Sequence, residues 1–148
     1  MTRPKKQSDQ FANVVSEDRE LLDDGEPCDH VFFGDVLPHD WLLARAAALV
    51  FPGRPGCLAR ALRAGCPLLA EPRAADDFFN ARQILTLGLG SAMHPHMLTE
   101  EGLSQILAER VLTEDVLERC RELSTIVAGE DGASAACARI DTFLQGAG

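Results

Sequence analysis

Two loops rich in proline, glycine and acidic residues hold the side chains best suited to chemistry. The first, residues 52–56, follows a short apolar run and precedes a helical pattern. A loop that leads from a buried strand into a helix N-terminus can offer free backbone N–H groups to an anion. The alternative is a loop whose Pro and Gly residues serve only its turns, and composition alone favours this second interpretation.

The second loop, residues 71–77, ends with two acidic residues, Asp76 and Asp77, where a helix is expected to begin. Two neighbouring carboxylates at this place could accept hydrogen bonds from sugar hydroxyls. The alternative needs no ligand: Asp76 is the helix N-cap and Asp77 is an acid of the first turn, which the helix dipole favours. The residues alone again favour the alternative.

The histidines do not form a catalytic or metal-binding pattern. His39 and Asp40 are adjacent, so they do not share a helix face. His94 and His96 flank Pro95 and have no third ligand nearby, which makes them a poor zinc site. We therefore expect no metal and place the histidines on the surface or in loops.

The five cysteines are widely spaced, and none belongs to a CxxC pair. Their odd number and the polar N-terminus, which lacks the apolar core of a signal peptide, lead us to expect free thiols in a reducing cytosol and hence a cytoplasmic protein. Cys120 and Cys137 lie in apolar helical patterns and are expected in the core.

Short apolar runs alternate with helical patterns from about residue 30 onward. Strands are predicted at about residues 30–33, 48–51, 67–70 and 89–93, and helices at 39–47, 57–64 and 76–87. Three further helices are expected to begin at Thr99, Thr113 and Ala133. This order predicts an α/β fold in which helices flank a narrow parallel sheet and the C-terminus is helical. Ligands of such folds bind beyond the carboxyl ends of the strands, where both loops lie.

Residues 1–27 differ from the rest and are predicted to be a separate polar arm, with the domain at residues 28–148. The apolar residues of the arm, among them Phe11, Val14 and Leu22, could form one short helix. A disordered or loosely docked arm is at least as good an interpretation.

Length and charge exclude several classes of protein. The chain has 148 residues, a net charge of -9 and only 5% aromatic residues. A broad basic face or a stacking platform for nucleic acid is therefore not expected. No apolar run approaches the length of a membrane-spanning helix. One domain of this size also excludes most complete two-domain enzymes.

Six segments, taken in order, resemble the C-terminal domain of sterol and lipid UDP-glucosyltransferases. These are two-domain enzymes of the GT-B class, related to bacterial glycosyltransferases that decorate antibiotics. Residues 36–42 resemble the family's VPHDWLF, residues 62–67 its LRAGVP, and residues 72–82 its PFFGDQPFWAR. Residues 87–90, 98–100 and 130–132 resemble LGVG, LTAE and EDG. The resemblance covers about residues 30–146, and residues 1–27 do not share it.

The resemblance implies a partial Rossmann-like domain that binds a UDP-sugar as donor substrate and needs no other cofactor. His39 and Trp41 would lie by the uracil, residues 52–57 would hold the diphosphate, and the two aspartates would take the sugar hydroxyls. The donor-binding residues implied in this way are His39, Trp41, Gly53, Arg54, Gly56, Cys57, Asp76 and Asp77.

The diphosphate loop departs from the family pattern His-His-Gly-Gly-Ala-Gly-Thr. Pro52 stands where the phosphate-contacting His is expected, and it can donate neither from its side chain nor from its backbone. Arg54 could supply a replacement positive charge. The alternative, which we favour somewhat, is a decayed site in which Arg54 is a solvated side chain. Asp77 replaces the family's Gln and adds a negative charge beside the expected diphosphate, which is unfavourable for binding it.

The expected function is that of the donor-binding part of a glycosyltransferase that transfers a hexose to a sterol or lipid hydroxyl. The family's general-base His belongs to an acceptor domain that these residues do not resemble, so we assign no catalytic residue. The chain alone is expected to be inactive and to need an acceptor-domain partner or to form a homodimer. The alternatives are a non-catalytic interaction module and a truncated gene product. Whether the chain is an enzyme is left open.

Overall fold

The computed structural model describes residues 13–16, 31–34, 37–97 and 99–146. They belong to two compact units, Met1–His39 and Asp40–Gly148. In the first unit, strands β1 (Asn13–Ser16) and β2 (Val31–Gly34) pair in parallel, with Asn13 opposite Val31. The predicted strand near residue 30 is confirmed. A helix is wrong at Asn13–Ser16, because these residues pair with a strand distant in sequence, which local periodicity does not reveal.

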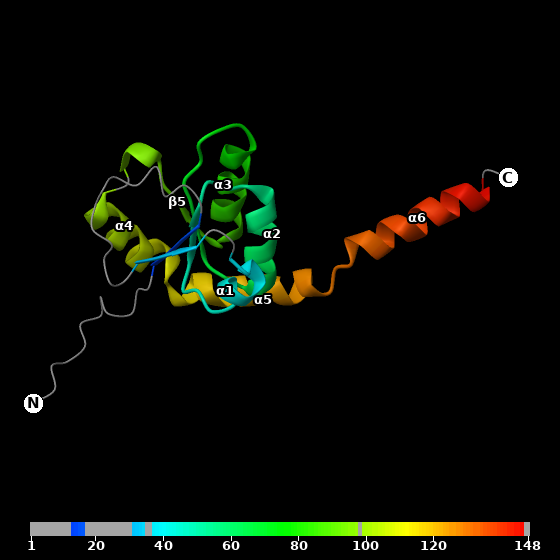
Figure 1. Cartoon of the computed structure of the whole chain (residues 1–148), viewed down its shortest axis with the longest axis horizontal. Coiled ribbons are helices and arrows are strands. Elements are labelled where there is room, and N and C mark those ends of the chain that lie inside the picture. Colours follow the sequence, from blue (N-terminus) through cyan, green and yellow to red (C-terminus); the bar gives the residue numbers. More distant parts are fainter. Residues whose placement is uncertain (1–12, 17–30, 35–36, 98, 147–148) are drawn as a thin grey trace, which may run out of the picture. The chain divides into compact units, whose positions relative to one another are not determined.

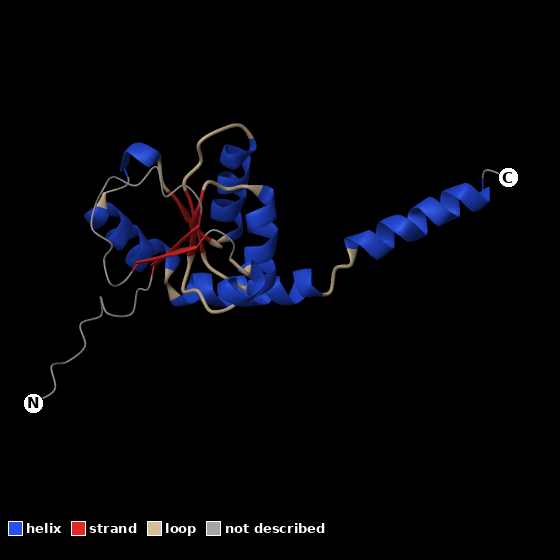
Figure 2. Cartoon of the chain, viewed as in Figure 1, coloured by secondary structure: helices blue, strands red, loops and turns tan. Residues whose placement is uncertain are grey.

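The second unit contains a three-stranded parallel sheet, drawn in red in Figure 2, and the order of its strands is β3-β4-β5. Its strands are β3 (Leu49–Phe51), β4 (Leu68–Ala70) and β5 (Gly90–Ala92). At their carboxyl ends Phe51 lies opposite Ala70, which lies opposite Ala92. The three segments that follow these strands therefore leave the sheet side by side, as the alternating pattern predicted.

Helices cover both faces of this sheet (Figure 1). On one face α2 (Pro55–Ala64), α3 (Asp76–Leu87) and α5 (Glu114–Ala128) pack with α1 (His39–Leu43). On the other, α4 (Glu100–Ile106) and the π-helical turn η4 (Leu107–Val111) cover Leu69 and Met93. The short 3-10 helix η3 (Pro95–Met97) follows β5. The larger core contains Leu68, Ile84 and Cys120, which lie on β4, α3 and α5.

The predicted helix starts at the two threonines are confirmed. The hydroxyl of Thr99 accepts from the N–H of Gly102 at 3.0 Å, and that of Thr113 accepts from the N–H of Val116 at 3.4 Å. These side chains satisfy backbone donors that the helices cannot pair themselves.

Two helix boundaries differ from the prediction. The helix expected at residues 39–47 ends at Leu43, and a turn follows in which the N–H groups of Arg45 and Ala46 both donate to Leu42 O. Helix α2 begins at Pro55 rather than at Cys57. Proline suits the first helical position because its missing N–H would be unpaired there anyway. Gly56 is therefore part of α2 and not of the loop.

The last helix, α6 (Gly132–Gly146), buries none of its residues. Asp131 precedes it and accepts from the N–H of Ser134 at 3.0 Å and from its hydroxyl at 2.6 Å. The hydrogen bond from the Ser134 side chain, with those from backbone N–H groups, lowers the pKa of Asp131. The EDG segment thus supplies the cap of this helix.

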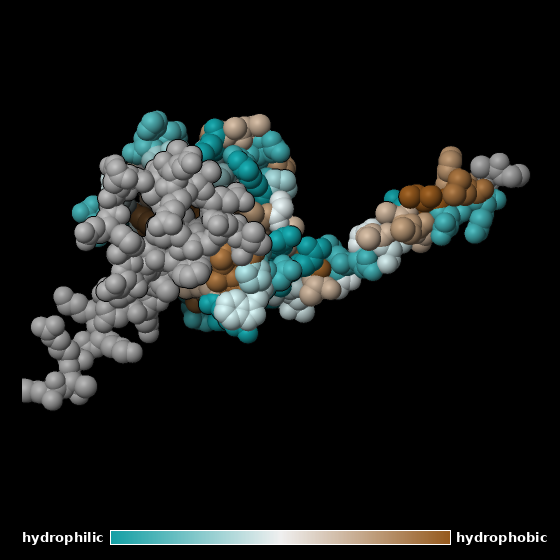
Figure 3. All heavy atoms as spheres, viewed as in Figure 1, coloured by the Kyte–Doolittle hydropathy of each residue, from teal (hydrophilic) through white to brown (hydrophobic). Residues whose placement is uncertain are grey.

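An apolar stripe on α6 is exposed. Phe143 is 74% exposed, and Ile140 and Leu144 are also open. Figure 3 shows apolar side chains gathered toward the C-terminal end of this helix. The expectation that Cys137 lies in the core is wrong, because it is exposed on α6, whereas Cys120 is buried as predicted. No helix in the described part of the chain is long and apolar enough to cross a membrane.

Candidate functional site

The site lies at the carboxyl edge of the three-stranded sheet, where the connections after β3, β4 and β5 lie next to one another. The N–H of Glu71 donates to Phe51 O at 2.8 Å, and the N–H of Met93 donates to Ala70 O at 2.8 Å. These hydrogen bonds continue the ladder one residue past the strands. Residues 52–54 and 71–75 therefore start from neighbouring points, as expected from the fold.

The first loop positions the N-terminus of α2. Arg54 is its N-cap, with an extended backbone (φ -63, ψ 137), and its exposed side chain caps nothing. The first N–H of α2 that bonds back is that of Leu58, which donates to Arg54 O at 3.0 Å. Among the described residues the N–H groups of Gly56 and Cys57 have no hydrogen-bond partner. Such donors at a helix N-terminus favour an anion.

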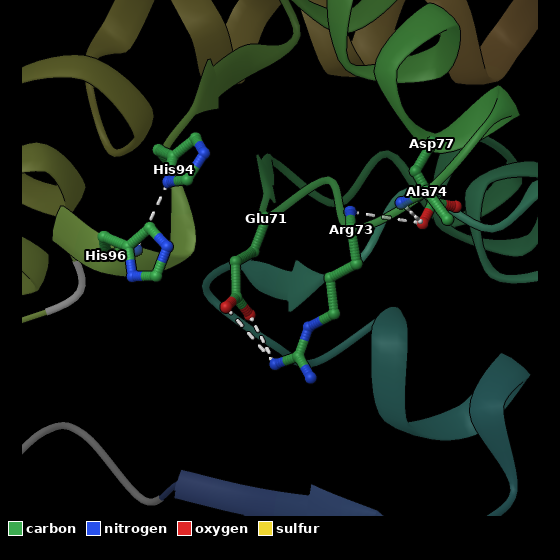
Figure 4. A network of polar contacts seen from close by, with 6 residues as sticks. All are labelled: Glu71, Arg73, Ala74, Asp77, His94 and His96. Carbon is green, nitrogen blue, oxygen red and sulfur yellow. Dashed lines mark hydrogen bonds and ion pairs between the residues drawn. The ribbon is translucent and has the colours of Figure 1, made fainter.

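The second loop turns sharply into α3. Ala75 has a φ of 38°, which is rare for a residue with a side chain. One carboxylate oxygen of Asp77 accepts from the N–H of Arg73 at 3.4 Å and of Ala74 at 3.3 Å (Figure 4). Asp77 holds the loop, whereas Asp76 is the first residue of α3 and exposed. The prediction that Asp76 is the N-cap is wrong, since Ala75 precedes the helix and the Asp77 carboxylate binds the loop amides.

The first loop is in direct contact with the start of α3, into which the second loop leads. The side-chain amide of Asn80, on α3, donates to Gly53 O at 2.7 Å. Gly53 is buried, with a φ of 109°, and a Cβ at this position would lie 3.1 Å from the carbonyl oxygen of Asp77. The glycine is required here by both its conformation and the close approach. The structure therefore brings together Gly53 and Asp77, which the sequence had assigned to different loops of one site.

An ion pair between a buried carboxylate and an exposed guanidinium follows β4. Glu71 is 8% exposed, and its two carboxylate oxygens accept from Nη2 of Arg73 at 3.1 and 3.2 Å (Figure 4). Sequence reasoning did not single out Glu71, Arg73 or Asn80. The available signal for Glu71 was a charged residue directly after a fully apolar strand, at the edge where ligands bind.

The histidines after β5 lie at the surface, as predicted. The rings of His94 and His96 stack with centroids 5.0 Å apart, and the N–H of His96 donates to Nδ1 of His94 at 3.3 Å. In the residues that the structure describes, no three His, Cys, Asp or Glu side chains are grouped as metal ligands.

The residues expected at the uracil, His39 and Trp41, both lie on α1. His39 is the last residue of the first unit and begins α1. Trp41 is 58% exposed, and the Arg45 guanidinium lies 4.4 Å from its ring centroid and donates to Trp41 O at 3.0 Å. One face of the indole is thus already covered. In the described part of the chain Trp41 makes no hydrogen bond with either loop.

Four cysteines are free thiols, as predicted, and Cys28 lies outside the described residues. Cys57 is half-buried in the first turn of α2. Burial, and secondly the neighbouring Cys120, raises the pKa of the Cys66 thiol to about 12. Burial also raises the pKa of Cys120. These two thiols are core groups without reactive character.

The fold and the site at its edge define the C-terminal domain of a GT-B glycosyltransferase. The sequence model of the erythromycin biosynthesis protein CIII-like C-terminal domain matches residues 11–140. The chain belongs to this family. The match begins at residue 11 and includes β1. The expectation that the family resemblance begins at about residue 30 is therefore wrong.

Curated relatives include sterol glucosyltransferases. The chain is 36% identical over 116 residues to sterol 3-beta-glucosyltransferase UGT80B1 of Arabidopsis thaliana, a match that covers 78% of this chain and 18% of that protein. It is 34% identical over 130 residues to the terpene cyclase-glycosyl transferase fusion protein fsoA of Humicola fuscoatra, which covers 80% of this chain and 10% of that protein. The chain thus spans less than a fifth of either relative.

Solved glycosyltransferases share the fold. The glycotransferase of kitacinnamycin has a TM-score of 0.77 at 24% identity, over 87% of this chain and 34% of that one. The calicheamicin glycosyltransferase CalG4 has a TM-score of 0.72 at 25% identity, over 79% of this chain and 31% of that one. This chain therefore corresponds to about a third of each.

Proposed function

We propose that the chain is the UDP-sugar-binding part of a glycosyltransferase that transfers a hexose to a sterol or lipid hydroxyl. The observation that carries the proposal is the contact of the first loop with the start of α3 at the carboxyl edge of the sheet, through Gly53 and Asp77. It places the N-terminus of α2 next to the start of α3. The names of the sterol glucosyltransferases among its relatives support the acceptor class.

The diphosphate would lie against the N-terminus of α2. The free N–H groups of Gly56 and Cys57 and the guanidinium of Arg54 can neutralise a leaving diphosphate, although Pro52 donates nothing. Asp76 remains exposed and can accept hydrogen bonds from sugar hydroxyls. Asp77 uses one oxygen on the loop amides, so its charge is partly satisfied there.

Transfer needs a general base within hydrogen-bond distance of the acceptor hydroxyl. We assign this base and the acceptor site to a further part of the enzyme, because the relatives are much longer than their match to this chain. The 148 residues then bind the donor and do not transfer it alone. The cytoplasmic location, the hexose and the homodimer remain predictions.

Calorimetric titration with UDP and UDP-glucose tests the proposal. We expect saturable binding at or below millimolar concentration, weakened by Arg54→Ala. Arg63→Ala is the matched control, because this arginine is exposed near the other end of α2. Absence of binding at millimolar UDP would refute the donor-binding role, and equal affinities of the two variants would remove Arg54 from the site.

A second candidate function is a non-catalytic interaction module. Two observations favour it: Pro52 in the phosphate loop and the exposed apolar stripe of α6. This function predicts no UDP binding together with a molar mass that rises with protein concentration. Light scattering of the ligand-free chain measures that mass, and a constant monomer mass would count against the module.

A further inference from the structure

We infer that Asn80 is a positioning residue that sets the direction of the Arg54 backbone N–H and thereby shapes the phosphate-facing side of the first loop. The part of this inference that concerns a ligand rests on the proposed function. The part that concerns the loop rests on the geometry of Asn80 and Gly53 alone.

The argument starts from the peptide bond between Gly53 and Arg54. It is trans, so its C=O and N–H point in opposite directions. The Asn80 amide donates to Gly53 O at 2.7 Å and so fixes that carbonyl toward α3. The N–H of Arg54 must then point away from α3, out of the contact between the loops.

The hydrogen bond from Asn80 is what orients the peptide group between Gly53 and Arg54. Among the described residues Asn80 is the hydrogen-bond donor to Gly53 O, and no backbone N–H shares that acceptor. Gly53 itself has a φ of 109°, a region that glycine enters and leaves easily. Without Asn80 the peptide group between Gly53 and Arg54 can rotate, because the backbone dihedral angles of glycine change at little energetic cost.

Helix α3, which carries Asn80, is anchored in the hydrophobic core. Ala81, next to Asn80, is 5% exposed, and Ile84 is 1% exposed in the main core. Asp77, three residues before Asn80 on the same helical face, holds the second loop through the N–H groups of Arg73 and Ala74. One side of α3 therefore forms hydrogen bonds with both loops.

The test compares Asn80→Asp with Gln83→Glu. Both replace a side-chain NH2 by oxygen and add one negative charge on α3, but the side chain of Gln83 forms no hydrogen bond with the described residues. In the ligand-free protein, Asn80→Asp should shift the amide resonances of residues 53–57 and speed their hydrogen exchange, while Gln83→Glu leaves them unchanged. Equal spectra of this segment in the two variants would overturn the inference.

Two further measurements keep the test decisive. In the wild-type protein, one side-chain N–H of Asn80 should exchange more slowly than those of Gln83, which needs no variant that might misfold; equally fast exchange would contradict the hydrogen bond. In titrations, Asn80→Asp should weaken UDP binding about fivefold, as expected for a lost hydrogen bond of about 1 kcal/mol, and leave uridine binding unchanged. A merely destabilised fold would weaken both ligands alike and would argue against positioning. Wild-type protein that binds neither ligand would refute the proposed function, while the exchange data would still decide the role of Asn80.

Discussion

The side-chain amide of Asn80 lies 2.7 Å from the carbonyl oxygen of Gly53 and joins helix α3 to the loop before α2. This relationship makes one site of two segments that are separate in sequence. It also explains why Gly53 is buried although it lies in a loop. The first loop is thus packed against α3 at the carboxyl edge of the sheet.

Gly53→Ala should destabilise the protein by about 1 to 3 kcal/mol, because alanine is strained at positive φ and its Cβ would press on the backbone of Asp77. Urea unfolding followed by circular dichroism measures this change. Gly56→Ala is the matched control, since a Cβ there meets nothing within 4 Å. It should be neutral or slightly stabilising in the first turn of α2. A neutral Gly53→Ala would show that the first loop and α3 are not in close contact.

Much of this fold could be predicted from the sequence, because its elements carry local signals. Helix α3 ends at the predicted Leu87, and Thr113 caps α5 as expected. Strand β1 could not be predicted, because pairing with β2 depends on residues distant in sequence. The exposure of Cys137 was missed for a related reason: an apolar stripe shows that a helix is amphipathic but not what it packs against.

The site was only partly predictable. The two loops followed from the βα order, because parallel strands place their carboxyl ends at one edge. The sequence did not show that Asp77 binds the loop amides while Asp76 stays exposed. This difference depends on the backbone turn at Ala75, which brings the Asp77 carboxylate onto those amides. Asn80 carried no signal, since its partner is a backbone carbonyl, which every residue possesses.

Arg73→Ala should destabilise the protein by about 1 kcal/mol, because it leaves the buried Glu71 carboxylate without its partner, while solvent screens the exposed guanidinium. Thermal or urea unfolding measures the loss. Adding Glu71→Gln to Arg73→Ala should recover a large part of it, since a neutral amide costs less to bury than an unpaired charge. A double variant no more stable than Arg73→Ala alone would show that the pair contributes little. Arg82→Ala, an exposed arginine on α3, serves as control.

Stability should fall as the pH rises above 9, because burial raises the pKa of the Cys66 thiol from 9.0 to about 12. Between these values the unfolded chain loses the thiol proton while the folded protein keeps it, so ionisation favours unfolding. The contribution is fully present below pH 9 and is lost as the pH approaches 12. Urea unfolding at pH 7 to 10.5 should show a smaller decline for Cys66→Ala than for the wild type. Cys137→Ala, at an exposed position, should follow the wild type. Identical declines in all three proteins would contradict a buried neutral Cys66.

Asp76 and Asp77 should respond differently to the same substitution. Asp76 is exposed at the start of α3, so Asp76→Asn should leave stability within about 0.5 kcal/mol of the wild type. If Asp76 binds the sugar, this variant should weaken UDP-glucose and leave UDP unchanged. Asp77→Asn keeps an oxygen for the amides of Arg73 and Ala74 but loses the charge that strengthens both hydrogen bonds. It should therefore lower stability by about 1 kcal/mol and change the two affinities alike, through the loop rather than through a direct contact. Calorimetry with both ligands, beside urea unfolding, separates these outcomes. A selective loss of UDP-glucose affinity in Asp77→Asn but not in Asp76→Asn would reverse the assignment, because the carboxylate that holds the loop would then also be the one that meets the sugar.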